Sequence, residues 1–247
     1  DGTADTALGS ILLRANAREY FSRGIQAKLT HSLQTESIEY DFEAGLRLHE
    51  DGEDRLQRDS TYHQSLGQLL LDDLGRWGNA GNQLQTADAV AAYFQSRITF
   101  KSAVLSPGLR LERIQQDRTR WETRASRTTD PADRSLGNLR DRRTNKVQVL
   151  LPGVGLLWPL TPTMSVVAGV HKGFTTPSNA PGVKPETALN YELGFRTSGQ
   201  TALEAIYFLS DYDNLLGQCT ASSGAQCTPG DSFNGNAATV QGLELTA

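Results

Sequence analysis

The clearest feature of the chain is an alternation of apolar and polar side chains with a period of two. Between Ser37 and His49 the even positions, from Ile38 to Leu48, are apolar or aromatic, whereas the odd positions are charged or small. Successive side chains of a β-strand point to opposite faces, so this pattern predicts a strand with one apolar face. The alternation recurs and predicts nine strands, at 21–33, 37–49, 88–100, 103–116, 146–158, 163–173, 187–197, 201–213 and 238–247.

The connections between these strands are alternately short and long. Short turns are expected at 34–36, 101–102, 159–162 and 198–200, and long loops at 50–87, 117–145, 174–186 and 214–237. Antiparallel up-and-down strands place all short turns at one end and all long loops at the other, as in outer-membrane barrels. Strand 37–49 is then expected to run outward, because a long loop follows it. Some 20 loop-like residues are expected before the first strand.

One apolar segment, from Val147 to Val170, is long enough to suggest a membrane-spanning helix. It contains Pro152, Pro159 and Pro162, and each proline inside a helix would cost about 3 kcal/mol. The segment is therefore interpreted as two strands joined by a turn at 159–162.

Alternation alone leaves two all-β classes open, because a soluble barrel or sandwich also has one apolar side per strand. Two observations favour a membrane barrel. Most predicted strands reach the 9–11 residues that a spanning strand needs. Aromatic residues also lie near the ends of the apolar faces, as in membrane-interface belts: Tyr20, Phe21, Phe100, Trp158, Phe174 and Tyr212. The predicted fold is an all-β, antiparallel up-and-down transmembrane β-barrel, of which about nine strands are present.

Composition excludes several other classes. Of the 247 residues, 24 are basic and 28 acidic, which gives a net charge of −4. Without a basic field, nucleic acid is not expected as a partner. The mean hydropathy of −0.43 does not suit a bundle of membrane helices.

No catalytic motif is present, so an enzyme is not expected. The histidines, at positions 31, 49, 63 and 171, form no HExxH pattern, and no GxSxG elbow occurs. A Ser/His/acid set assembled across strands stays open as an alternative. The acidic segment at 49–54 lacks the spacing of an EF-hand loop, so no metal site or cofactor is expected.

Five segments resemble the barrel of TonB-dependent outer-membrane receptors. "SPGLRLERI" at 106–114 is similar to the family's "PGLRYE" strand, and "LLPGVGLLWPLTPTMSVVAGVHKGF" at 150–174 to the paired strands that follow. "VKPETALNYELGFR" at 183–196 resembles its "KPE…NYELG" strand. "ALEAIYFLSDYDNLL" at 202–216 and "VQGLEL" at 240–245 continue in the expected order. Earlier in the chain, "GLRLHEDGEDRLQRD" resembles the ferric-citrate-type branch.

This resemblance implies a barrel of about 22 strands in the bacterial outer membrane, filled by a separate plug domain. It implies uptake of a ferric chelate, a siderophore or ferric citrate, energised by the TonB complex through the plug. The chain matches neither the plug nor enough strands to close such a barrel. We therefore expect residues 1–247 to be an interior part of the barrel of a longer receptor, with outer-membrane lipid and lipopolysaccharide around it.

Cargo binding is expected in two of the long loops. Loop 117–145 is rich in arginine, whose guanidinium matches the carboxylates of an anionic chelate, although contact with lipopolysaccharide phosphates is the alternative. Loop 50–87 has a leucine-rich segment that suggests a short helix at the barrel mouth, either a gate or simple loop packing. The candidate ligand-binding residues are Arg118, Arg120, Trp121, Arg124, Tyr62, His63, Arg76 and Trp77.

The polar faces of the strands are expected to line the lumen. By the resemblance, charged residues there would contact the plug through hydrogen bonds and ion pairs. These plug-facing candidates are Glu43, Arg47, Arg97, Arg110, Glu112, Glu192 and Arg196.

Cys219 and Cys227 are separated by seven residues in a predicted outside loop. The oxidising compartment favours a disulfide, with two free thiols as the alternative.

The predicted function is TonB-energised uptake of a ferric chelate. The alternatives are a passive porin and a TonB-dependent receptor for haem, cobalamin, a nickel chelate or a sugar.

Overall fold

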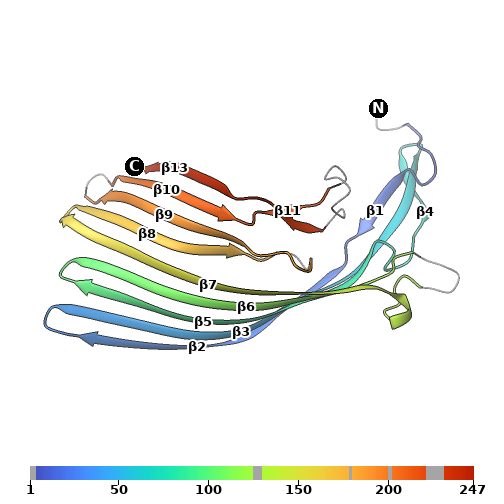
Figure 1. The fold of residues 1–247 in the computed structure, drawn as a ribbon. Helices are drawn as coiled ribbons and strands as arrows, with labels where there is room; N and C mark the ends of the chain where they lie inside the picture. Colours follow the sequence, from blue (N-terminus) through green and yellow to red (C-terminus); the bar gives the residue numbers. More distant parts are fainter. Residues whose placement is uncertain (1–3, 125–129, 178–179, 200–201, 221–230) are drawn as a thin grey trace. The chain divides into compact units, whose positions relative to one another are not determined.

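The computed structural model describes residues 4–124, 130–177, 180–199, 202–220 and 231–247. Eleven strands form one sheet in the order β1-β3-β5-β6-β7-β8-β9-β10-β13, with β2 and β4 also paired to β3 (Figure 1). Strands β11 and β12 form a separate antiparallel pair. The elements are β1 (Ile11–Ala15), β2 (Arg18–Gln34), β3 (Ile38–Ser65), β4 (Gln68–Asp73), β5 (Gly81–Phe100), β6 (Ala103–Trp121), the 3₁₀ turn η1 (Leu136–Asn138), β7 (Leu139–Thr161), β8 (Met164–Thr175), β9 (Glu186–Thr197), β10 (Glu204–Asp213), β11 (Leu216–Gln218), β12 (Ser232–Asn234) and β13 (Ala238–Thr246).

The chain forms two compact units, and several strands contribute to both. Unit 1 comprises Asp1–Arg23, Glu50–Ala87 and Gln116–Thr144. Unit 2 comprises Gly24–His49, Asp88–Gln115 and Asn145–Ala247.

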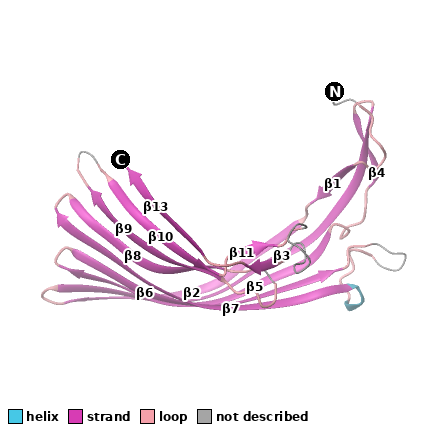
Figure 2. Ribbon diagram, turned by 45° about the horizontal axis from the view of Figure 1, so that its top comes forward, coloured by secondary structure: helices cyan, strands magenta, loops and turns pink. Residues whose placement is uncertain are grey.

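All nine predicted strands are present, and the alternation of short and long connections is confirmed in unit 2. The β2–β3, β5–β6, β7–β8 and β9–β10 turns lie together at one end of this unit, at the left of Figure 1. Neighbouring strands are antiparallel, with β8, β9, β10 and β13 side by side in Figure 2. The described residues contain no helix that is long and apolar enough to cross a membrane.

The predicted long loops were wrong in unit 1, where much of them is strand. β3 continues to Ser65, β5 begins at Gly81, β6 continues to Trp121 and β7 begins at Leu139. These extensions carry polar side chains on both faces, as in Glu53, Asp54 and Arg55, so no apolar alternation marks them. Residues 11–15, expected as loop, form β1 against β3.

The leucine-rich segment is a strand, not the expected helix. Leu66 and Gly67 both have positive φ, 49° and 75°. Two such residues make a turn of the type that joins β-hairpins, so β4 folds back on β3 and places Leu71 opposite Tyr62.

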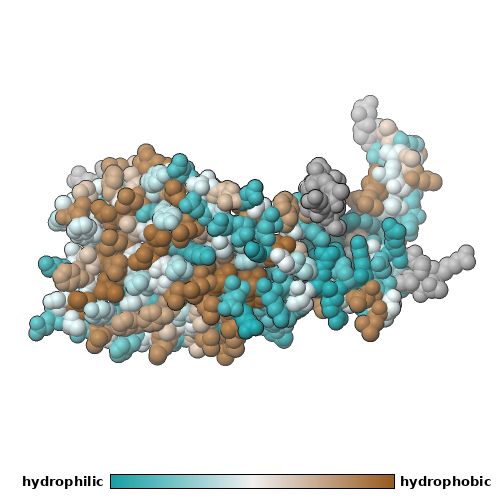
Figure 3. Space-filling model, viewed as in Figure 1, coloured by the Kyte–Doolittle hydropathy of each residue, from teal (hydrophilic) through white to brown (hydrophobic). Residues whose placement is uncertain are grey.

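One face of unit 2 exposes large apolar side chains. Ile25 and Leu29 on β2 are 70% and 72% exposed, and Leu193 on β9 is 59% exposed. Apolar residues gather over these strands in the space-filling view (Figure 3). No second sheet covers this face within the described ranges, so the sandwich alternative does not fit. The strands β8, β9, β10 and β13, of 12, 12, 10 and 9 residues, have about the length that spans a bilayer.

Cross-strand pairs of an aromatic residue and a glycine recur in both units. The ring of Tyr93 lies against Gly45, where an added Cβ would be 2.2 Å from the Tyr93 Cε1 atom. The same arrangement joins three further pairs: Phe21 with Gly52, Phe208 with Gly242, and Phe233 with Gly217. An aromatic ring over glycine covers the bare backbone and fixes the pairing of the two strands.

Gly45→Ala is expected to destabilise the barrel, because the new methyl group displaces the Tyr93 ring. The expected cost is about 1–3 kcal/mol, the usual range for overpacking. The measurement is the temperature at which the complete receptor loses its folded mobility in detergent electrophoresis. Gly155→Ala is the matched control, because its Cβ would meet no atom nearer than the Ser106 Cβ at 4.0 Å. Equal stability of the two variants would contradict the role given to the ring.

Candidate functional site

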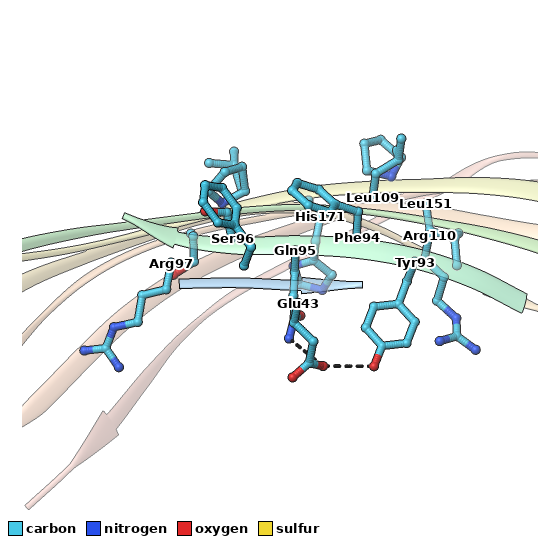
Figure 4. A pocket seen from close by; sticks show the side chains of 18 of the residues that line it. Glu43, Tyr93, Phe94, Gln95, Ser96, Arg97, Leu109, Arg110, Leu151 and His171 are labelled. Atoms are coloured by element: carbon cyan, nitrogen blue, oxygen red, sulfur yellow. Dashed lines mark hydrogen bonds between the residues drawn. The ribbon is translucent and has the colours of Figure 1, made fainter. Parts of the chain in front are cut away.

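Polar side chains gather on the face of unit 2 opposite the exposed apolar side chains. They border a hollow of about 1120 Å³ between β2 and β9. Figure 4 shows Glu43, Tyr93, Arg97 and Arg110 on the same side of the sheet. The alternation of each strand produces this arrangement, so the predicted polar face is one continuous wall.

Glu43 is the centre of a hydrogen-bond network that joins three strands. The Lys28 Nζ atom lies 3.0 Å from Glu43 Oε2. The Tyr93 hydroxyl donates to Glu43 Oε1 at 2.9 Å, and Gln95 Nε2 donates to the same oxygen at 3.3 Å. The sequence singled out Glu43 alone. The three partners were missed because each is polar at a polar position and carries no further signal.

Three more of the plug-facing candidates are paired within the sheet. Arg110 Nε donates to Glu112 Oε1 at 2.6 Å, and its guanidinium lies 5.7 Å from the centre of the Tyr93 ring. Arg196 pairs with Glu204 on the neighbouring strand. These charges are largely compensated inside unit 2.

Arg47, Arg97 and Glu192 differ from the paired residues. They border the hollow, and none of their side chains makes an ion pair or hydrogen bond with any residue that the structure describes. The wall therefore combines a fixed hydrogen-bond network with charged side chains that are available to bind another molecule.

The predicted ligand-binding residues all lie in unit 1 but do not form one site. Arg120 and Trp121 are successive strand residues and so lie on opposite faces. Arg120 Nε donates to Asp141 Oδ2 at 2.9 Å. The Trp121 ring instead lies 5.1 Å from the guanidinium of Arg134.

The candidates from the expected loop 50–87 also make separate contacts. Tyr62 lies between β1 and β4, opposite Ile11 and Leu71. His63 Nδ1 lies 2.6 Å from Asp72 Oδ1. The Trp77 ring, in the β4–β5 connection, lies 4.6 Å from the Arg58 guanidinium.

Of the four candidate arginines, two are exposed. Arg76 and Arg124 have exposed side chains and no partner among the described residues, whereas Arg118 is partly buried. An anionic ligand would meet Arg76 or Arg124 without first breaking an ion pair.

The sequence did not single out two ion pairs that stabilise unit 1. Arg134 Nη1 donates to Asp54 Oδ2 at 2.8 Å, and Arg14 Nε donates to Asp59 Oδ1 at 2.7 Å. Hydrogen bonds from these arginines lower the pKa of the Asp54 and Asp59 carboxyl groups. A carboxyl whose pKa is lower in the folded state stabilises the fold above its unfolded pKa of about 4. That contribution is lost as the pH falls through the folded-state pKa.

The predicted Cys219–Cys227 disulfide falls partly outside the described residues. Cys227 is not among them, and Cys219 is buried. In the described part of the chain, no three His, Cys, Asp or Glu side chains are placed to hold a metal ion.

Several solved structures with a similar fold are import, siderophore and uptake receptors. The ferric-catecholate import receptor Fiu from E. coli K12 matches with a TM-score of 0.68 at 16% identity, over 93% of this chain and 35% of that one. The siderophore receptor PiuA from Acinetobacter baumannii gives 0.65 at 13%, over 95% and 37%. The ferric yersiniabactin uptake receptor FyuA from Yersinia pestis gives 0.63 at 17%, over 95% and 33%. At these identities the likeness shows the fold.

The chain spans about a third of the length of these receptors. No curated protein sequence matches it significantly. The profile of one family, described as TonB dependent receptor-like, beta-barrel, matches residues 3–247. The antiparallel sheet, with one apolar and one polar face, agrees with that match, and the chain belongs to the TonB-dependent receptor β-barrel family.

Proposed function

We propose that this chain is part of the barrel wall of an outer-membrane receptor that takes up a ferric chelate with energy from the TonB complex. The observation that carries the proposal is the family match over nearly the whole chain. The similar solved structures include receptors described as importing a ferric catecholate and ferric yersiniabactin. In this proposal the chain carries out no covalent chemistry. It supplies part of the barrel wall, charged side chains and loops.

The apolar face of unit 2 faces outer-membrane lipid in this proposal. The exposed side chains along β2, β9 and β13, such as Leu29, Leu193 and Leu245, would otherwise be left in water. Burying a side chain of this size in an apolar phase contributes about 1.5–3 kcal/mol. The backbone groups at this depth are satisfied by the strand ladder, which a bilayer requires.

The polar wall of unit 2 faces the receptor's own plug domain. Arg47, Arg97 and Glu192 supply charges for groups on the plug, because they have no partner within the described residues. The Glu43 network and the Arg110–Glu112 pair keep their places in the wall while the plug moves.

The cargo is a carboxylate-rich ferric chelate, bound outside the membrane by unit 1. Arg76 and Arg124 are exposed, and an arginine guanidinium binds a carboxylate with two parallel hydrogen bonds. Arg120 has a different role, because Asp141 already occupies its guanidinium. Lipopolysaccharide surrounds this part of the barrel.

Deletion of the complete gene is expected to abolish uptake of one ferric chelate. The measurement is radioiron uptake by deletion cells, against a panel that includes ferric citrate, with the gene restored in the presence and absence of TonB. Restoration only with TonB is the expected result. Unchanged uptake of every iron chelate would remove iron as cargo and leave haem, cobalamin, nickel chelates and sugars. Restoration without TonB would support a passive porin instead.

Reversal of charge at Arg97 is expected to loosen the plug. Arg97→Glu puts a negative charge where the wall offers a free cation, so a large antibiotic such as vancomycin should enter cells several-fold more readily. Arg140→Glu is the matched control. It reverses the same charge at an exposed position of β7 in unit 1, which contributes no residue to the polar wall of unit 2. Equal permeability of the two variants would contradict a plug contact at Arg97.

A further inference from the structure

Unit 1 contains a pocket that the uptake function does not use. It has a volume of about 320 Å³, and we call it the Trp77 pocket. Its lining combines apolar surface with two acidic side chains and one basic side chain: Ala17, Leu56, Trp77, Glu19, Asp54 and Arg134. Arg18 borders the pocket too, but its guanidinium pairs with Glu53 on the opposite face of the sheet.

Trp77 gives this pocket an aromatic surface. The Arg58 guanidinium lies 4.6 Å from the centre of the indole ring, yet 40% of Trp77 stays exposed. Leu56 and Ala17 extend the apolar surface beside it. The exposed part of an aromatic ring offers apolar surface to the C–H groups of a ligand.

The loop that carries Trp77 passes close to other parts of the backbone at two glycines with positive φ. Gly75 and Gly78 have φ of 68° and 91°. An added Cβ would come within 2.1 Å of the Asp59 carbonyl oxygen at Gly75, and of the Pro131 carbonyl oxygen at Gly78. Trp77 is thereby fixed between two close backbone approaches, so the pocket exists before a ligand arrives.

Arg134, which also lines the pocket, is held by hydrogen bonds. Its Nε atom donates to Asn82 Oδ1 at 2.8 Å, and its Nη1 atom donates to Asp54 at 2.8 Å. Asn82 is 2% exposed and also donates to the Pro131 carbonyl oxygen at 2.8 Å. The buried Asn82 amide therefore links the loop to Arg134. This link fixes the guanidinium at the pocket's rim, where it can donate hydrogen bonds to a ligand.

The charges on the rim suit a ligand that carries hydroxyl groups. Two carboxylates and one guanidinium line the pocket, and Asp54 pairs with Arg134. A rim with charges of both signs offers both hydrogen-bond donors and acceptors. The volume equals that of about ten waters at roughly 30 Å³ each, which suits a single small ring.

We propose that the Trp77 pocket binds one sugar ring of an oligosaccharide at the cell surface. A sugar ring has C–H groups on its face, which lie against Trp77, and hydroxyl groups on its edge. Those hydroxyls donate to Asp54 and Glu19 and accept from Arg134. The lining of the pocket includes neither of the proposed cargo residues, Arg76 and Arg124, so this proposal does not depend on the identity of the cargo.

The test measures sugar binding to the complete receptor in detergent by saturation-transfer NMR. The probes are methyl α-glucoside, methyl α-galactoside, methyl α-mannoside and the delipidated core oligosaccharide of the host's lipopolysaccharide. The expected result is transfer to at least one probe, reduced at least five-fold in Trp77→Ala. Trp77→Phe, which keeps a ring, should retain most of the transfer.

Trp158→Phe is the matched control, because Trp158 lies in unit 2 and should not affect binding. If Trp77→Ala does not fold, Glu19→Leu tests the same pocket from an exposed strand position and should lose the same transfer. Transfer to the core oligosaccharide alone identifies the lipopolysaccharide as the source, and transfer to simple glycosides identifies a free sugar. Absence of transfer from the wild-type receptor, or full transfer from the folded pocket variants, would overturn the proposal.

Discussion

The structure depends above all on the hydrogen bonds between neighbouring strands. A bilayer offers no partner to a backbone amide or carbonyl, so each strand must be satisfied by the strands beside it. This requirement frees the side chains of unit 2 from building a core, and few large apolar side chains in the described structure are buried, Val147 and Val149 among them. One face can then be apolar for lipid, and the other can carry the Glu43 network and the unpaired Arg47 and Arg97.

The fold of unit 2 was predictable because lipid and lumen impose opposite demands on successive residues. Ile38 to Leu48 alternate strictly for this reason, and the strand that they form is in the structure. The strand extensions in unit 1 were not predictable in the same way. Both faces of residues 53–55 are polar, so a strand there has the composition of a loop.

The predicted sites show a similar division. Alternation placed Glu43, Arg97 and Arg110 on one wall correctly, because a face follows from position along a strand. It gave no information about pairing, which depends on the register between strands. Arg120 beside Asp141, and Arg134 beside Asp54, are separated by 21 and 80 residues in sequence. The glycine at position 45 likewise has meaning only once Tyr93 is placed across from it.

Strand β3 pairs with β1, β2, β4 and β5, so one segment of 28 residues sets the alignment of four others. Inserting or deleting a single residue within it would turn the following side chains to the opposite face and shift every partner at once. Over evolution, a change in the length of β3 is therefore harder to accommodate than the exchange of a single side chain. Variation in length among related proteins is expected to accumulate instead in the connections, such as the segment between β6 and β7.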